Sequence, residues 1–390
     1  MTIDIASIRA DTPACDTLMH FNNAGAALSP FCVTEALIEH LRLEQRIGGY
    51  EAAIAAEDAL ANFYRAFARL LHCNSTEIAF AENATHAWNN VFMAIDFTAG
   101  DRILTGQSEY ASNYLSFLHL ARRRGVLVEV IPNTEDGVLD VEKLQAAIRD
   151  DVKLIAITHV PSQCGVIHPA AEVGRIARAH DILYLLDACQ SAGQLLLDVR
   201  TLGCDMLTGT GRKYLRGPRG TGFLYVREES LPRLEPAWVD LHSARWLAPN
   251  DYSLRNDARR FENWECFTAG KIGLGVAVDY ALSIGLPEIE ARVAALARHL
   301  RETLGTLPGV QVHEHGQKLS GIVTFSKQGV PATQLQSQLQ QQGINSSVTR
   351  TDNSQLDLAQ RGLVDLNRAS VHYYNTESEI VRFCDAVASI

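Results

Sequence analysis

The sequence predicts an α/β protein built on a large, mainly parallel sheet, with a smaller α+β domain toward the C-terminus. Short apolar segments with the character of strands alternate with helical segments between residues 78 and 226. One of them, 154–160, is almost continuously apolar, as buried parallel strands are. The chain has 390 residues, a length for which two domains are the natural expectation.

Ahead of the sheet, the N-terminal part of the chain is expected to be helical. Residues 1–19 form an arm, and alanines and leucines then recur at helical spacing over 31–47 and 51–72, with a break at Gly48 and Gly49. Further elements are expected at 78–80 (strand), from 84 (helix), at 101–105 and 126–132 (strands), 139–149 (helix), 154–160 (strand), 169–180 (helix), 182–186 (strand) and 223–226 (strand). We assign residues 20–270 to the large domain.

The C-terminal third is expected to form the smaller domain. After the last of these strands the pattern is less regular, and Trp238, Trp246 and Tyr252 are expected in a loop. A helix rich in small residues, 271–284, is expected to link the domains. The remaining elements are expected at 286–307 (helix), 310–314 and 321–326 (strands), 332–342 (helix), 344–348 and 369–373 (strands). Residues 271–390 form the smaller domain, together with the N-terminal arm.

Composition and charge argue against several classes of protein. The net charge of −10 disfavours nucleic acid or an anionic membrane as the partner. No apolar run approaches the length that spans a bilayer, and the first residues lack the apolar core of a signal peptide. None of the eight cysteines forms a C-x-x-C pair, so neither a disulfide framework nor a zinc site is expected. These features predict a cytoplasmic protein.

One short run invites a metal interpretation. His313-Glu314-His315 would place two histidines on the same face of a strand, but no third ligand lies nearby in the sequence. We therefore favour a solvated polar edge at these residues and expect no metal site.

The stretch from Tyr184 to Val226 carries the strongest chemical signal. An apolar run ends in Asp187, and Lys213 follows in a loop of glycines and threonines that leads to a Gly-Pro turn. Pyridoxal phosphate needs a lysine amine for a Schiff base and a carboxylate that keeps its ring nitrogen protonated. Either residue alone would more often be structural or solvated. Their order suits this cofactor, and the chain has only six lysines to choose from.

A second stretch suits a phosphate group. Ala84-Thr85-His86 forms a small-residue turn between a predicted strand and a predicted helix. Backbone N–H groups and the helix dipole face an anion at such a turn. On spacing alone this signal is weak, because any junction between a strand and a helix looks similar.

Together these stretches resemble the class V aminotransferase family of fold type I pyridoxal-phosphate enzymes. That family includes cysteine desulfurases, selenocysteine lyases, isopenicillin N epimerase-like proteins and hercynylcysteine sulfoxide lyases. The resemblance covers nearly the whole chain, and its separate motifs occur in the right order. It implies a fold type I architecture, pyridoxal 5'-phosphate as cofactor, an amino acid as substrate, and a homodimer with shared active sites.

For the cofactor, the resemblance implies Lys213 as the catalytic Schiff-base lysine and Asp187 as the partner of the pyridine nitrogen. The other implied contacts are Ala84, Thr85, His86, Thr210 and Arg212 at the phosphate, Tyr110 on the ring face, and Gln190, Ser162 and Gln163 near the ring hydroxyl. Many members carry His directly before the lysine, where this chain has Arg212. Many place Asn at the position of Ser162, and Gln163 is the second candidate for that role.

For the substrate, the resemblance implies Ala24 and Gly25 at the border of the pocket and Arg368 at the carboxylate. A fixed guanidinium suits bidentate capture of a carboxylate, and a surface salt bridge is the alternative role for Arg368. Arg350 is implied near the distal end of the substrate, with a solvated loop arginine as the alternative. Glu265 stands where relatives lend a Thr to the partner's phosphate. A carboxylate would repel phosphate, so that contact is not expected here.

The resemblance leaves the reaction open. Desulfurases attack the substrate sulfur with a loop cysteine that lies shortly before the carboxylate arginine. Here residues 345–367 contain no cysteine, and none lies between Cys266 and Cys384. A thiolate is needed to carry sulfur away as a persulfide. We therefore expect a C–S β-lyase that acts on a cysteine derivative, ahead of an amino-acid epimerase or an aminotransferase. The non-enzyme alternative is a catalytically silent relative that binds the cofactor.

Overall fold

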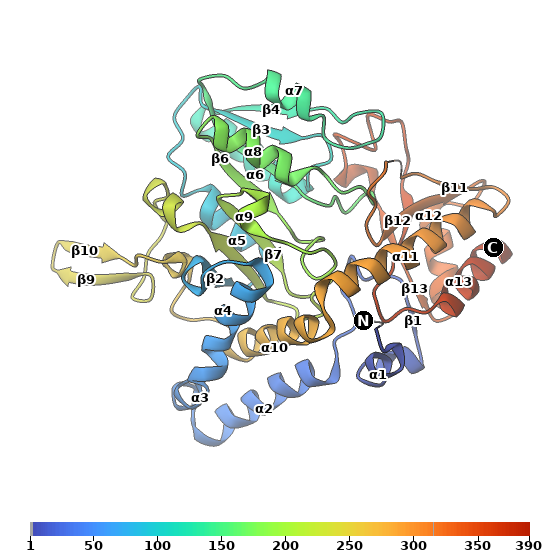
Figure 1. Ribbon diagram of the computed structural model, residues 1–390, viewed down its shortest axis with the longest axis horizontal. Coiled ribbons are helices and arrows are strands. Elements are labelled where there is room, and N and C mark those ends of the chain that lie inside the picture. The colour runs from blue at the N-terminus through green and yellow to red at the C-terminus, as the bar shows by residue number, and fades with distance from the viewer. Residues whose placement is uncertain (1–2, 315) are drawn as a thin grey trace.

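The core of the molecule is a seven-stranded sheet (Figure 1). The computed structural model describes residues 3–314 and 316–390. The strand order is β2-β8-β7-β6-β5-β3-β4, with bounds Ile78–Ala81 (β2), Arg102–Gly106 (β3), Leu127–Ile131 (β4), Val152–Thr158 (β5), Leu183–Asp187 (β6), Met206–Thr210 (β7) and Gly222–Val226 (β8). Within this sheet β8 runs antiparallel to both neighbours and the other pairs are parallel. The predicted α/β class with a mainly parallel sheet is confirmed.

Side chains of the central strands alternate between two apolar clusters on opposite faces of the sheet. On β6, Tyr184 and Leu186 join the larger cluster, whereas Leu183 and Leu185 join the smaller one. The connecting helices are Ala84–Phe92 (α5), Ala111–Arg124 (α6), Val141–Ala146 (α7), Ala170–Ala179 (α8) and Val199–Leu202 (α9). Because both faces are covered, both carry apolar side chains, which explains the nearly continuous apolar runs in the sequence.

Long helices form a layer on the lower side of the molecule in Figure 1. They comprise Phe31–Ile47 (α2), Gly49–Ala55 (α3), Glu57–Leu71 (α4) and Thr268–Ile284 (α10). Helix α10 packs against α2 and α4. A Cβ on Gly273 would collide with the side chain of Leu37, and one on Gly275 would crowd the backbone of Phe63. The small residues of the predicted linking helix therefore serve close helix packing.

A second sheet of four strands lies toward the C-terminal end, in the order β11-β12-β15-β14. Its strands are Val310–Val312 (β11), Ile322–Lys327 (β12), Ser347–Thr349 (β14) and Leu366–Ser370 (β15). The helices of this region are Leu286–Gly305 (α11), Ala332–Gln341 (α12) and Glu377–Ser389 (α13). This is the predicted smaller α+β unit, and its boundary at residue 271 stays a prediction.

The N-terminal arm joins this second region. Met19–His20 (β1) pairs in parallel with Ile344–Asn345 (β13), and Asn22 bridges to Ser370 of β15. The arm begins with Ile5–Ala10 (α1) and Pro13–Asp16 (η1). The remaining 3-10 turns of the described chain are Ser75–Glu77 (η2), Glu228–Arg233 (η3), Ala258–Phe261 (η4) and Thr351–Asn353 (η5). The N-terminal arm thus contacts strands of the C-terminal region.

The prediction of a loop after β8 is wrong over part of its length. Ala244–Ala248 (β9) and Asp251–Leu254 (β10) form an antiparallel hairpin that projects from the body of the molecule (Figure 1). Trp246 and Tyr252 are exposed on it. A hairpin without a buried face has no alternation of apolar and polar residues, so its sequence does not reveal the strands.

Three further details correct the sequence predictions. The strand expected at 369–373 is β15, which ends at Ser370, because the N–H of His372 turns to donate to the Asn375 side chain. Helix α7 covers less than the expected 139–149. His313 and Glu314 are buried instead of solvated, and the Glu314 carboxylate accepts the N–H of Thr324 and faces Arg301. His315 lies outside the described residues.

In the described chain, no single helix is long and apolar enough to cross a membrane; α10 and α11 meet that test only as a pair bent by 80°.

Candidate active site

A cavity opens at the carboxyl ends of β5, β6 and β7. Its empty volume is about 430 Å³, open mouth included. The predicted residues that line it are Ala84, Thr85, Tyr110, Ser162, Asp187, Gln190, Thr210, Arg212 and Lys213. The sequence did not single out four other lining residues, Asn83, Thr158, Val160 and Cys189. Open α/β sheets bind their ligands at this end of the strands.

Lys213 lies in the loop that follows β7 and is 7% exposed. Burial lowers the pKa of its amine, and the positive charge of Arg212 lowers it further. The Nζ atom lies 6.0 Å from the centre of the Tyr110 ring. A lowered pKa increases the share of neutral amine at neutral pH, which is the form that attacks a carbonyl or accepts a proton.

Asp187 ends β6, and its carboxylate is held from two sides. Oδ1 accepts the backbone N–H of Cys189 at 2.8 Å, and Oδ2 accepts Nδ2 of Asn113 at 2.8 Å. The residue is 3% exposed. Its orientation is therefore set by the protein before any ligand binds, as electrostatic preorganisation requires.

Gln190 connects the cavity to the N-terminal segment. Its Nε2 donates to the carbonyl of Ala24 at 3.1 Å, and the N–H of Ala27 donates to the Arg212 carbonyl at 2.8 Å. Ala24 and Gly25 thus lie beside the lysine loop without lining the cavity. The Oε1 of Gln190 is buried and has no partner in the described chain. An unpaired buried acceptor is costly, and a ligand hydroxyl here would satisfy it.

The N-terminus of α5 forms one corner of the cavity. Asn83 caps the helix, and its Oδ1 accepts the N–H of His86 at 2.8 Å. The N–H groups of Ala84 and Thr85 belong to the first turn, which has no intrahelical acceptors. Gly222 lets β8 approach this turn closely, since a Cβ there would lie 3.1 Å from the Ala84 nitrogen.

The side chains of Thr210 and Arg212 complete this corner. The side chain of His86, which was also predicted at the phosphate, does not line the cavity. The Nη1 of Arg212 donates to Oγ1 of Thr210 at 2.9 Å, and both residues line the cavity. Together with the helix N-terminus they make a cationic corner rich in donors, which fits a phosphate. His86 instead pairs with Glu82, and its ring stacks on Trp238 at 5.9 Å.

The two candidate residues in the loop after β5 point in different directions. Ser162 lines the cavity, whereas Gln163 is buried and donates from Nε2 to the Ser108 carbonyl at 3.0 Å. Nη1 of Arg368 donates to the Ser162 carbonyl at 3.0 Å, and Nη2 donates to Oδ1 of Asn22 at 3.4 Å. The buried Nε of Arg368 has no partner among the described residues. The guanidinium therefore retains donor capacity next to the cavity.

Arg350 lies away from this group of residues. It is exposed, precedes η5 and does not line the cavity. Downstream of it the chain folds inward, because Asp357 and Leu358 are buried and Ser108 Oγ donates to Asp357 Oδ2 at 3.4 Å. The substrate role of Arg350 stays a prediction.

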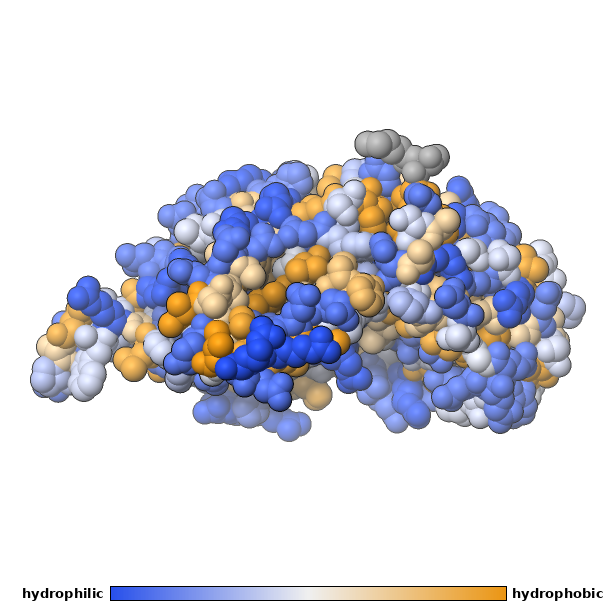
Figure 2. Space-filling view, turned by 90° about the horizontal axis from the view of Figure 1, so that it is seen from below, coloured by the Kyte–Doolittle hydropathy of each residue, from blue (hydrophilic) through white to orange (hydrophobic). Residues whose placement is uncertain are grey.

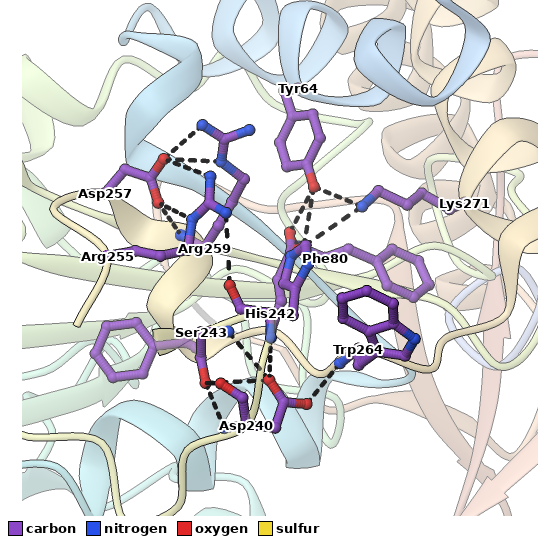
Figure 3. A network of polar contacts seen from close by, with 12 residues as sticks. Tyr64, Phe80, Asp240, His242, Ser243, Arg255, Asp257, Arg259, Trp264 and Lys271 are labelled. Atoms are coloured by element: carbon purple, nitrogen blue, oxygen red, sulfur yellow. Dashed lines mark hydrogen bonds and ion pairs between the residues drawn. The ribbon is translucent and has the colours of Figure 1, made fainter. Parts of the chain in front are cut away.

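A buried polar network holds the segment that leads to Glu265 (Figure 3). At its centre the Glu262 carboxylate accepts the Phe80 N–H at 2.7 Å and the Tyr64 hydroxyl at 2.9 Å, and it lies 3.5 Å from Nζ of Lys271. Burial alone would raise the pKa of Glu262, but Lys271 and His242 hold it below its usual range. The network therefore contains a fixed anion.

Beyond the network the chain returns to the surface. The N–H of Trp264 donates to Oδ2 of Asp240 at 2.6 Å, and both Trp264 and Glu265 are exposed (Figure 3 labels Trp264 and Asp240). Neither lines the cavity of its own chain. The expected lack of a phosphate contact from Glu265 stays a prediction about the partner subunit.

The residues of the cavity fit pyridoxal phosphate. A buried lysine amine suits its aldehyde, and a fixed carboxylate at Asp187 suits its ring nitrogen. The unpartnered amide oxygen of Gln190 suits a ring hydroxyl, and the corner around Arg212 suits a phosphate. The donors and acceptors thus match the cofactor on each of its polar groups.

Known proteins resemble this chain over its whole length. The aminotransferase class-V family model matches residues 19–383. A probable cysteine desulfurase of Methanothermobacter thermautotrophicus is 30% identical over 379 residues, which cover 96% of this chain and 94% of that protein. The apo structure of a cysteine desulfurase from Thermococcus onnurineus NA1 superposes with a TM-score of 0.92 at 28% identity, covering 100% and 98% of the two chains.

A cystine C–S lyase, solved in complex with its reaction product cysteine persulfide, has the same fold with a TM-score of 0.88. At 23% identity over 97% of this chain and 99% of that one, it shows the fold alone. The family match, in contrast, spans both sheets and includes every predicted cofactor residue. The chain therefore belongs to the class V aminotransferase family of fold type I enzymes, whose cofactor is pyridoxal 5'-phosphate.

Proposed function

We propose that the protein is a C–S β-lyase that removes the sulfur substituent of a cysteine derivative without a cysteine nucleophile. The observation that carries this proposal is the composition of residues 345–367, the segment that leads to Arg368 and contains no cysteine. The resemblance drawn from the sequence implies that desulfurases use a thiolate from this segment. A hydroxyl or carboxylate cannot carry sulfur away as an enzyme persulfide.

Each polar residue of the site has one proposed task. Bound pyridoxal phosphate supplies the electron sink for the reaction. Arg368 binds the substrate carboxylate through its N–H groups. Lys213, whose pKa burial lowers, takes the proton from the α-carbon as a general base. Asp187 holds a proton on the ring nitrogen, and Arg212 and Thr210 bind the phosphate.

The reaction is redox-neutral. Loss of the α-proton leaves an electron pair that forms the Cα–Cβ double bond while the Cβ–S bond breaks. The sulfur leaves with its bonding electrons and takes up the proton that Lys213 carries. The three-carbon remainder adds water and gives pyruvate and ammonia. With cystine as the substrate, the sulfur product is cysteine persulfide.

Cysteine desulfurase is the second candidate, because the desulfurases compared above are 28% and 30% identical to this chain. Cys189 is the one thiol that lines the described cavity. Burial raises the pKa of Cys189 well above its ordinary value, and the charge of Asp187 raises it further. The thiolate that a desulfurase needs is therefore scarce here. Epimerisation and amino-group transfer also begin with removal of the α-proton. As candidate functions they rank after the desulfurase.

A substrate screen tests the proposal. Cysteine, cystine, cysteine sulfoxides and thioether conjugates are each incubated with the holoenzyme, and pyruvate, ammonia and enzyme-bound persulfide are measured. We expect pyruvate in equal amount to the released sulfur product, and the same yield from Cys189→Ala. Persulfide on the enzyme without pyruvate, lost in Cys189→Ala, would identify a desulfurase. Exchange of the α-proton alone would identify an epimerase.

The proposed assembly is a homodimer with shared active sites. Large apolar side chains of α2 and α3 are exposed, namely Phe31, Leu41, Ile47, Tyr50 and Ile54. Figure 2 views the molecule from below Figure 1 and shows hydrophobic side chains gathered near the middle of that face. Clustered exposed apolar surface is typical of protein interfaces.

Light scattering tests this assembly. Ile54→Glu should shift the protein toward monomer, whereas Val364→Glu, at an equally exposed residue outside the patch, should not. Equal masses for both variants would contradict the proposed interface.

We also propose a cytoplasmic location, because the eight cysteines are unpaired in the structure, as reducing compartments favour.

A further inference from the structure

A second buried carboxyl lies behind the cavity, in the turn between β3 and α6. Oε1 of Glu109 accepts the Tyr110 N–H at 2.8 Å, Nδ2 of Asn113 at 2.9 Å and Oγ1 of Thr158 at 2.5 Å. Its Oε2 accepts Oγ1 of Thr105 at 3.2 Å. Glu109 is 5% exposed and does not line the cavity, so it acts only through its neighbours.

Asn113 connects this carboxyl to Asp187. It lies in the first turn of α6, and its Nδ2 donates to both Glu109 Oε1 at 2.9 Å and Asp187 Oδ2 at 2.8 Å. A side-chain amide nitrogen has two hydrogens, so both are used. β3 and β6 flank β5 in the sheet. The amide therefore bridges groups that follow two non-adjacent strands.

We propose that Asn113 and Glu109 are positioning residues that fix the carboxylate of Asp187 toward the ring nitrogen of the cofactor. This inference rests on the role proposed above for Asp187. The Cys189 N–H holds one carboxylate oxygen and Asn113 holds the other, so rotation of the carboxylate breaks both bonds. Glu109 keeps the Asn113 amide from turning away.

The same carboxyl also places the aromatic residue of the ring face. Glu109 accepts the backbone N–H of Tyr110, the N-cap residue of α6, whose ring lies near Lys213. One buried group thus positions two residues that are proposed to contact the cofactor. Burial raises the pKa of Glu109 to about 7, and the negative charge of Asp187 contributes to the rise. Burial raises the pKa of Tyr184, and the charge of Glu109 is a lesser cause of that rise.

Replacement of Asn113 by alanine tests the inference. We compare Asn113→Ala with Asp187→Asn and with Asn90→Ala, a control that removes an equally buried amide bonded to the Phe261 carbonyl. The readouts are the dissociation constant of pyridoxal phosphate, the pH midpoint of the visible absorbance of the bound cofactor, and kcat and KM separately. Far-UV circular dichroism of the apo protein checks that each variant folds.

We expect Asn113→Ala to weaken cofactor binding and lower kcat on the order of 10- to 100-fold, the effect of losing one hydrogen bond to a charged group. The pH midpoint should move in the same direction as in Asp187→Asn, with KM for the amino acid unchanged because Arg368 is untouched. Glu109→Leu should repeat this pattern, and Glu109→Gln, which keeps an acceptor for Asn113, should restore most of it.

Two results would overturn the inference, and they differ in meaning. If Asn113→Ala behaves like Asn90→Ala while Asp187→Asn loses cofactor affinity, the positioning role is wrong and the proposed function stands. If Asp187→Asn itself leaves affinity and absorbance unchanged, the proposed role of Asp187 is wrong and the inference falls with it.

Discussion

The guanidinium of Arg368 donates to the backbone carbonyl of Ser162 at 3.0 Å. Arg368 belongs to β15 of the smaller sheet, and Ser162 follows β5 of the large one. The residue proposed for the substrate carboxylate is thus held against a loop that lines the cofactor cavity. The site is completed only when the two sheets lie together.

Arg368→Ala should weaken substrate binding while cofactor loading is retained. Loss of a charged, hydrogen-bonded partner should cost on the order of 2–5 kcal/mol of binding free energy. Steady-state kinetics give KM, and visible absorbance gives cofactor occupancy. Arg382→Ala, at an exposed arginine on α13, is the control. An unchanged KM for Arg368→Ala would show that the carboxylate binds elsewhere.

Lys213→Ala should abolish covalent attachment of the cofactor. A buried amine with a lowered pKa is available for attachment, and the chain has five other lysines. Borohydride reduction followed by peptide mass spectrometry locates the adduct. Lys271→Met is the matched control, because Lys271 is also buried but bonds to Tyr64 away from the cavity. An adduct on any lysine except Lys213 would refute the assignment.

The apo protein should lose stability as the pH rises through neutrality, because of Glu109. Its folded-state pKa is raised from 4.5 to about 7, so the folded state binds the proton more tightly than the unfolded state does. The contribution of Glu109 to the free energy of unfolding is therefore complete below about pH 4.5, and it is lost as the pH rises through about 7. The loss amounts to about 3 kcal/mol relative to Glu109→Gln.

Urea unfolding of both proteins at about pH 5 and about pH 8 measures most of this loss. The free energy of unfolding should fall more for the parent than for Glu109→Gln. A constant difference between the two proteins at both pH values would contradict the prediction.

Arg216→Met should destabilise the fold. Arg216 is fully buried, and it donates to the Leu28 carbonyl at 2.8 Å, the Tyr373 hydroxyl at 2.9 Å and Oγ1 of Thr12 at 2.6 Å. Unpaired buried acceptors cost about 1–3 kcal/mol each, so a loss of several kcal/mol in unfolding free energy is expected. Urea denaturation measures it, with Arg219→Met at an exposed residue as the control. Equal stability of the two variants would contradict the prediction.

The sequence predicts those parts of the site that neighbouring residues encode. Asp187 ends an apolar strand and Lys213 follows a glycine-rich turn, so both are visible as local patterns and both line the cavity. Asn113 and Glu109 are not visible as local patterns, because their proposed function depends on the contact between Asn113 and Asp187, which lie 74 residues apart in the sequence. An acid in the short turn between a buried strand and a helix was the available signal.

Exposure explains the other differences. Pattern-based prediction reads burial, so it finds six of the seven strands of the large sheet, which is covered on both faces. It misses β7, whose buried residues include Thr208, Gly209 and Thr210, and it misses the hairpin β9–β10, which has no covered face. For the same reason it cannot place Arg350, whose side chain is exposed and whose loop folds inward further on. His313 and Glu314 read as polar, yet pairing with Arg301 allows Glu314 to be buried.

The pairing of β1 with β13 limits how early the N-terminal segment can take its place during synthesis. Met19 leaves the ribosome early, but its partner Ile344 is translated near the end of the chain. Until then β1 has no strand to pair with, and contacts this distant in sequence form late in folding. The segment with Ala24 therefore reaches Gln190 only in a nearly finished chain. Nascent chains that stop before residue 344 should remain inactive, even though all strands of the large sheet are already translated.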